Sequence, residues 1–192
     1  MRSRFLAAFA AAGLLACGSA QATSIGVFFA PDGTDCDGTA VAFAPFLTYF
    51  GAVLGGDAAQ AGLTVAEFRG DGYDPSWFNT VTPSPTSNLA LGNPIAGGCN
   101  IAFPACQSGS NSFVLLYTVQ SIALSPPGDR VLAVRQHTTP SNVNFQCPLV
   151  TLCDQAFTLF CVQAGEGFLN HSVPCTVGVE QKSWSEIKRL FD

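Results

Sequence analysis

Short apolar runs, separated by Gly, Pro, Asn and Ser, recur along most of this 192-residue chain. They fall at residues 24–30, 39–54, 63–69, 77–81, 113–122, 130–135, 157–162 and 175–179. Runs of this length with turn residues between them are typical of β-strands. Seven or eight such runs in one chain predict an all-β fold, a β-sandwich. Residues 57–66 predict at most one or two helical turns, because Gly62 interrupts them.

The end of the chain predicts a short C-terminal helix at about residues 184–191. Ser183 and Glu186 have the spacing of a capping box. Three apolar side chains then recur on one face at helical spacing: Trp184, Ile187 and Phe191. A helix this short is not stable alone, so its apolar face must dock. Docking on the chain's own sandwich and recognition by a secretion or anchoring partner both remain open.

The first 22 residues read as a secretory signal peptide. Two arginines precede an apolar run at residues 5–16, and an A-x-A site ends at Ala22. The run is shorter than the ~20 residues that a spanning helix needs. An alternative is a bacterial lipobox at residues 14–17, in which Cys17 is lipidated and anchors the protein to a membrane. We therefore predict a signal peptide at 1–22 and a single β-sandwich domain at 23–192. We place it in the periplasm, on the outer surface or outside a bacterial cell, without a transmembrane segment.

Seven cysteines follow the signal peptide, and in an exported chain they predict disulfides. The sequence contains no C-x-x-C motif, the spacing that would indicate a metal site made of thiolates. Sequence proximity favours Cys99–Cys106, with two further bridges among the last four cysteines, Cys147, Cys153, Cys161 and Cys175. Because seven is odd, one thiol is left over, and this pairing leaves Cys36 as the free thiol.

The charge distribution narrows the class of partner. Lys and Arg number 8 against 13 Asp and Glu, which excludes a basic nucleic-acid-binding protein. Residues 75–128 contain no charged residue. Such a stretch is either buried or presents a neutral surface of hydroxyl and amide groups.

Several short segments of the sequence are similar to those of a known group of proteins. They lie at residues 66–69, 92–94, 99–104, 137–142 and 147–154, and in the tail at 175–191. Together they resemble a group of secreted bacterial proteins built as immunoglobulin- or cohesin-like sandwiches. The resemblance implies an all-β, immunoglobulin-like β-sandwich for the mature chain and transfers no functional residue, since a sandwich hosts many functions.

An acidic loop is the candidate metal site. Asp32, Asp35 and Asp37 precede Gly38, and carboxylate-rich loops suit calcium. The loop lacks the full calcium pattern, because Gly33 stands where the first Asp is required. The alternative is ordinary turn chemistry, in which each Asp caps the backbone. No cofactor is predicted, and calcium is the alternative to that prediction.

Exposed aromatic residues are the candidate ligand site. Tyr73, Trp77 and Phe78 could stack against a glycan, although aromatic residues in a sandwich also fill the core. Glu67 lies inside an otherwise apolar strand, and if buried it needs a partner such as Arg69 or Arg135.

No catalytic residue is assigned, because His137 and His171 accompany no nucleophile motif. We therefore predict an exported, non-enzymatic surface or matrix interaction module that binds an extracellular protein or glycan. The alternative is a secreted polysaccharide-active hydrolase, acting through Glu67, Glu166 or another carboxylate pair, or a glycan-binding module.

Overall fold

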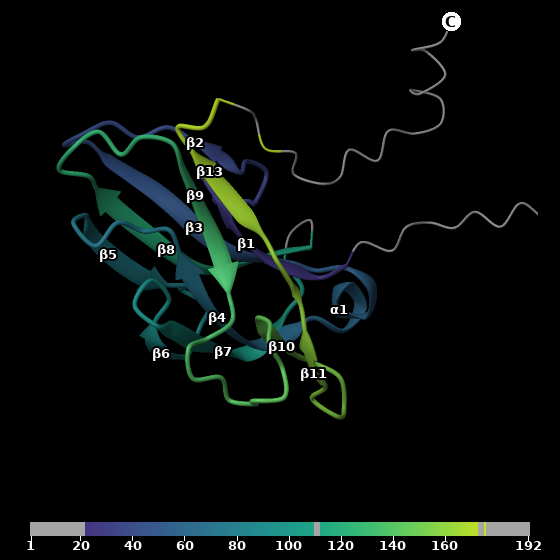
Figure 1. Cartoon of the computed structure of the whole chain (residues 1–192). Coiled ribbons are helices and arrows are strands. Elements are labelled where there is room, and N and C mark those ends of the chain that lie inside the picture. The colour runs from purple at the N-terminus through teal and green to yellow at the C-terminus, as the bar shows by residue number, and fades with distance from the viewer. Residues whose placement is uncertain (1–21, 110–111, 173–174, 176–192) are drawn as a thin grey trace, which may run out of the picture.

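A computed structural model describes residues 22–109, 112–172 and 175 of the chain. The predicted signal peptide up to residue 21, Cys17 and the predicted helix at 184–191 lie outside the described residues. The described residues contain one helix, α1 (Gly56–Ala61) (Figure 1). They also contain thirteen strands: β1 (Ser24–Phe28), β2 (Asp37–Gly38), β3 (Pro45–Val53), β4 (Leu63–Asp71), β5 (Phe78–Pro83), β6 (Leu89–Asn93), β7 (Gly98–Gln107), β8 (Phe113–Ile122), β9 (Arg130–Arg135), β10 (Leu149–Leu152), β11 (Leu159–Cys161), β12 (Gln163–Ala164) and β13 (Glu166–Leu169).

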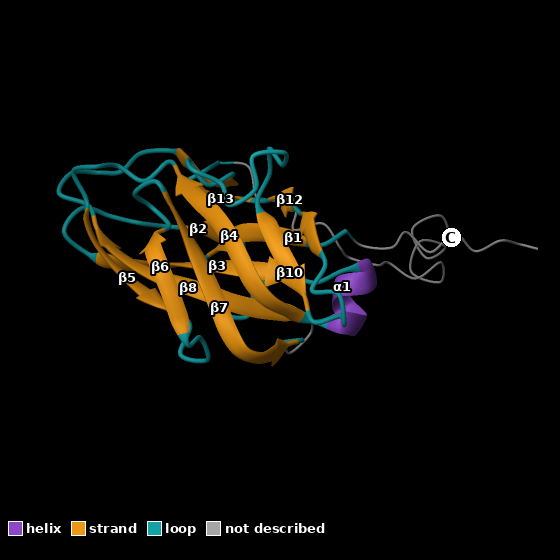
Figure 2. Cartoon of the chain, turned by 90° about the horizontal axis from the view of Figure 1, so that it is seen from below, coloured by secondary structure: helices purple, strands orange, loops and turns teal. Residues whose placement is uncertain are grey.

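Two sheets pack face to face, so the predicted β-sandwich is confirmed (Figure 2). The first sheet has the order β12-β1-β3-β8-β5. The second has the order β11-β10-β4-β9-β13-β2, and β7 pairs with β4 and with β6. Most neighbours are antiparallel, but β1 pairs parallel with β12 and β13 pairs parallel with β2.

The core lies between the two sheets, because each strand turns alternate side chains inward. Strand β3 shows the alternation in its first six residues, with Phe46, Thr48 and Phe50 buried. Phe50 packs against Phe68 of β4 across the core, with ring centroids 5.2 Å apart. The ring of Tyr117 in β8 also packs against Phe68, with ring centroids 6.1 Å apart. Aromatic rings from both sheets therefore fill the centre of the sandwich.

The two ends of the sandwich differ. Helix α1 lies beside the end of β3, and the start of β5 lies at the opposite end (Figures 1 and 2). Strand β3 has nine residues and so connects ends that are about 30 Å apart. Within the described ranges, no helix is long and apolar enough to cross a bilayer.

Candidate functional site

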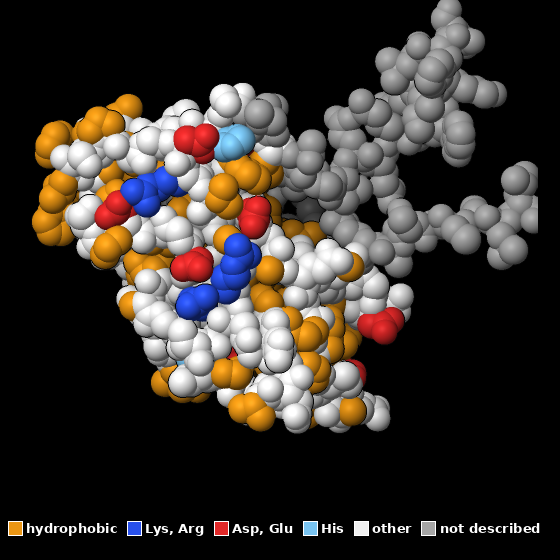
Figure 3. Space-filling view, viewed as in Figure 1, with side chains coloured by type: hydrophobic (Ala, Val, Ile, Leu, Met, Phe, Trp, Pro, Cys, Tyr) orange, Lys and Arg blue, Asp and Glu red, His pale blue; other side chains and the backbone are white. Residues whose placement is uncertain are grey.

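Five apolar side chains are exposed at the end of the sandwich where β3 begins and β8 ends. We call this surface the apolar end. Its members are 42–74% exposed, whereas most large apolar residues in the described part of the chain are buried: Val41, Phe43, Leu47, Phe78 and Leu124. Hydrophobic side chains gather at this edge of the molecule in Figure 3, beside a band of charged side chains across the middle of the same view.

Strand register explains why residues far apart in the sequence meet here. Pro45 of β3 and Phe78 of β5 are both paired with Ile122 of β8, one from each side. The three side chains therefore form a row on the outer face of the first sheet. Leu47 lies two residues further along β3, so its side chain is on the same face.

Phe43 is the most unusual residue of the apolar end. Its side chain is 74% exposed, and its backbone φ is 63°, in the left-handed region. The amide of Phe43 donates to the carbonyl of Ala123 at 2.8 Å, which ties the loop before β3 to the loop after β8. The left-handed conformation costs about 1–2 kcal/mol for a residue other than Gly. A strained backbone that holds a large apolar side chain out to solvent is typical of a functional position.

A buried cluster supports the apolar end from below. Trp77 packs edge to face on Phe46, with ring centroids 5.3 Å apart, and Ala123 belongs to the same cluster. The guanidinium of Arg130 lies 5.1 Å from the centre of the Trp77 ring and forms an ion pair with Asp74. These contacts hold the supporting strands together, so the apolar end is preformed.

The sheet face that continues from the apolar end carries no charge. None of the residues of β3, β5 and β8 is charged. Strand pairing places Thr80 beside Gln120 and Thr82 beside Thr118 on this face. The uncharged stretch at residues 75–128 therefore contributes to a neutral surface. A partner can gain apolar contacts and neutral hydrogen bonds here, but no ion pairs.

The predicted aromatic platform is wrong for two of its three members. Trp77 is only 6% exposed, since it belongs to the supporting cluster. Tyr73 packs against the core, and its hydroxyl lies 2.7 Å from Oγ1 of Thr48. Burial raises the pKa of Tyr73 far above its ordinary value. Only Phe78 is exposed, and it belongs to the apolar end.

The predicted calcium loop is not assembled as a metal site. Asp32 accepts hydrogen bonds from the amide and the hydroxyl of Thr34, and Asp35 accepts one from the amide of Asp37. Asp37 in turn accepts a hydrogen bond from the amide of Cys175 at 2.7 Å. The bonds from Thr34 lower the pKa of Asp32. In the described part of the chain no three ligand side chains come together around a metal position, so turn chemistry accounts for these carboxylates.

The predicted cysteine pairing is wrong at Cys36 and at Cys99. The described cysteines form three bridges: Cys36–Cys175, Cys106–Cys153 and Cys147–Cys161. Among these described cysteines Cys99 is free, and it is buried. Cys99 and Cys106 lie seven residues apart on the extended strand β7, roughly 23 Å, whereas a bridge needs Cα atoms about 6 Å apart. Proximity in sequence was therefore misleading.

Cys99 lies on the core face of β7 with Ile101 and Phe103. Burial raises the pKa of its thiol to about 12. At neutral pH the thiol is therefore protonated and weakly nucleophilic. It fills space in the core and does not provide a catalytic nucleophile.

The buried carboxylate of Glu67 has a structural partner that the sequence did not indicate. Both of its oxygens lie 3.1 Å from the amide nitrogen of Ser141, in the long loop between β9 and β10. The two arginines expected as partners bind other carboxylates: Arg69 pairs with Asp71, and Arg135 with Glu166. Glu67 thus fixes the long loop onto the second sheet.

The histidines also occupy structural positions. Nδ1 of His137 accepts a hydrogen bond from the amide of Thr139 at 3.0 Å. Its ring packs on Gly98, where a Cβ atom would lie 2.4 Å from the ring. His171 lies 3.6 Å from the carboxylate of Asp129. Each of these contacts fixes a loop or strand end.

Comparisons with known proteins identify the fold. No family model and no curated protein matches the sequence. Among solved structures, the sixth cohesin of scaffoldin B from Acetivibrio cellulolyticus, in complex with a mutant Cel5 dockerin, superposes with a TM-score of 0.51 at 8% identity, covering 78% of this chain and 99% of that chain. A cohesin module of a Clostridium perfringens family 33 glycoside hydrolase superposes with a TM-score of 0.51 at 10% identity, covering 79% and 97%. The cohesin-like sandwich implied by the resemblance is therefore confirmed.

Sequence reasoning missed four of the five residues of the apolar end: Val41, Phe43, Leu47 and Leu124. The available signal was the uncharged stretch at 75–128, which marks β5 and β8 but not the loop before β3. The positive φ of Phe43 could not be predicted from the sequence, because the residue types that signal such a conformation are Gly and Asn and not Phe.

Proposed function

We propose that this chain is an exported, non-enzymatic module that binds a protein partner through the apolar end. The observation that carries the proposal is Phe43, a bulky apolar side chain held 74% exposed by a backbone conformation that favours glycine. Selection for stability alone replaces such a residue with Gly or Asn. Its presence is explained when the side chain makes contacts outside the domain.

The chemistry of the surface defines the partner. Interface centres are depleted of charge and enriched in aromatic residues. The apolar end exposes two phenylalanines, which lie over the buried cluster of Trp77 and Phe46 and beside the uncharged face of the first sheet. The partner is therefore a protein that presents an uncharged apolar surface. The dockerin bound to the Acetivibrio cellulolyticus cohesin is a precedent for protein recognition by a sandwich of this kind.

Two observations support export. Three disulfides persist in oxidising compartments outside the cytoplasm. Thr23 is already fixed within the domain, and β1 begins at Ser24. Cleavage after Ala22 would therefore remove no described helix or strand. Membership of a group of secreted bacterial proteins is also part of this proposal, and lipidation of Cys17 remains the alternative to cleavage after Ala22.

Site-specific photo-crosslinking tests the proposal. The photoreactive amino acid p-benzoylphenylalanine is placed at position 43 in the mature protein, which is then mixed with the extracellular fraction of the producing cells. We expect a discrete protein adduct that disappears when Phe78→Asn is added. The matched control carries the probe at Leu91, which is 55% exposed on β6. Equal adducts from both positions, or none from position 43, would refute the proposal.

The identity of the adduct, together with an activity assay on polysaccharide, separates the rival functions. A glycan adduct that depends on Phe43 would replace the protein partner with a glycan. Release of sugar from polysaccharide by the purified protein would establish the hydrolase instead. A lipid adduct would identify the apolar end as a membrane-contacting surface.

A further inference from the structure

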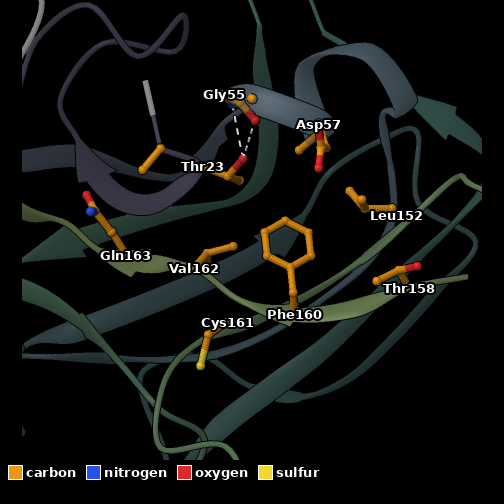
Figure 4. A pocket seen from close by; sticks show the side chains of 12 residues that line it. Thr23, Gly55, Asp57, Leu152, Thr158, Phe160, Cys161, Val162 and Gln163 are labelled. Carbon is orange, nitrogen blue, oxygen red and sulfur yellow. Dashed lines mark hydrogen bonds between the residues drawn. The ribbon is translucent and has the colours of Figure 1, made fainter. Parts of the chain in front are cut away.

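A second apolar feature lies at the opposite end of the sandwich, beside α1. It is a pocket of about 680 Å³, within the range of ~300–1,000 Å³ that is typical of ligand sites. Leu152, Phe160 and Val162 form its apolar wall, and Ala58 of α1 contributes to its lining. The Phe160 ring points into the pocket in Figure 4, whereas the sulfur of Cys161 points away from it.

The polar groups around the pocket are mostly bonded within the domain. The Thr23 hydroxyl donates to the carbonyl of Gly55 at 2.8 Å and accepts from its amide at 3.1 Å. The amide and the hydroxyl of Thr158 both donate to Asp154. Asp57, in the first turn of α1, is exposed at the rim. A bound segment would therefore meet an apolar wall and one carboxylate.

The chain has a segment that can reach this pocket. Seventeen residues follow Cys175, which is fixed by its bridge to Cys36. Cys175 and Val53 pack against the same buried cluster, and Gly55 of the pocket is two residues beyond Val53. Residues 176–183 span up to about 26 Å when extended. This length covers the path from Cys175 to the pocket.

The tail also matches the pocket in chemistry. A helix at 184–191 would place three apolar side chains on one face: Trp184, Ile187 and Phe191. At 100° per residue, Lys188 lies beside this face and Arg189 lies opposite it. The apolar face suits the wall formed by Leu152, Phe160 and Val162. Lys188 is then the cation that the tail offers to the carboxylate at the rim, beside the amino group of Thr23 in a chain cleaved after Ala22.

We propose that residues 184–191 dock as a helix in this pocket of their own chain, with Trp184, Ile187 and Phe191 against the wall and Lys188 beside Asp57. This contact does not depend on the proposed function of the apolar end. It gives the short tail helix the tertiary support that it needs. It also covers the Phe160 ring, which is the partly exposed side chain of the wall.

Hydrogen exchange of the full mature protein with intact disulfides tests the proposal. We expect amides of residues 187–191 to exchange at least about tenfold more slowly than in an unstructured peptide. Ile187→Asp should abolish this protection and speed exchange of the pocket residues 158–163. The matched control is Ser185→Asp, which adds the same charge on the outer side of the helix and should keep the protection.

A charge exchange locates the docking site. Asp57→Lys should weaken tail protection by about threefold, because a like charge then faces Lys188. Combining Asp57→Lys with Lys188→Asp should restore it. The proposal is wrong if the wild-type tail exchanges without protection, or if both Asp57→Lys and Ile187→Asp leave its exchange unchanged. Protection that rises with protein concentration, together with a dimeric mass, would place the tail in a second copy and would also overturn it.

Discussion

The longest disulfide loop should contribute more to stability than the shortest one. Cys36–Cys175 joins residues 139 apart, whereas Cys147–Cys161 joins residues 14 apart. The Cys106–Cys153 bridge bypasses 47 residues of the longer loop. The longer loop therefore behaves in the unfolded chain as one of about 90 residues, worth about 4.7 kcal/mol in the chain-entropy model, against about 3 kcal/mol for the short loop.

The measurement compares two double variants of the mature protein by guanidinium unfolding. Cys36→Ala with Cys175→Ala should lower the free energy of unfolding by about 1.5 kcal/mol more than Cys147→Ala with Cys161→Ala does. Loss of the buried Cys36 sulfur can only widen this difference, because Cys36 packs with Phe28 and Phe113. The dependence of the unfolding free energy on guanidinium concentration should also become steeper in the first variant than in the second, since the unfolded state of the first variant expands more. Equal losses in the two variants would refute the loop-length argument.

Three further predictions follow from single positions. Cys99 should resist alkylation by iodoacetamide at pH 8 in the native protein and should react after unfolding, because burial raises the pKa of its thiol to about 12. Mass spectrometry of the labelled peptide measures the reaction, and rapid labelling of the native protein would contradict the prediction. Gly72→Ala should destabilise the protein by at least about 2 kcal/mol in thermal unfolding, because its backbone φ is +88° and the new Cβ atom would lie 2.2 Å from the Val131 carbonyl oxygen. Gly56→Ala is the control, since its new Cβ atom would meet no atom within 4 Å. Hydrogen bonds from Ser76 lower the pKa of Asp74 below 3.8, so its carboxylate stabilises the fold above that pH and the contribution disappears as pH falls through the lowered value. Asp74→Asn should therefore lose more stability in urea at pH 7 than at pH 3, and an equal loss at both pH values would contradict this.

The sequence predicted those strands whose residues are both β-prone and buried. The ranges 113–122 and 130–135 match β8 and β9 to the residue, because their Val, Leu and Tyr residues form continuous runs bounded by turns. Strand β6 was missed because all five of its residues are exposed, so no apolar pattern marks it. Strand β7 was missed because Gly98 and Pro104 interrupt its pattern.

The functional surface was harder to predict than the fold. Val41 and Leu124 lie more than eighty residues apart in sequence, and only the pairing of β3 with β8 brings their loops together. The disulfide pairing depends on the same long-range register. Cys106 belongs to β7, and Cys153 belongs to the turn after β10. Strands β7 and β10 both pair with β4 in the second sheet, and this pairing brings the two cysteines together. Spacing along the chain carries no information about such neighbours.

The Cys36–Cys175 bridge determines how the domain would bear mechanical tension. Twelve of the thirteen described strands lie between these two cysteines, and only β1 precedes them. A pulling force applied between the two ends of the chain would pass through the covalent bridge and bypass those twelve strands. Extension would be limited to the N-terminal segment with β1 and to the tail. A chain held at both ends would thus keep its apolar end intact under tension.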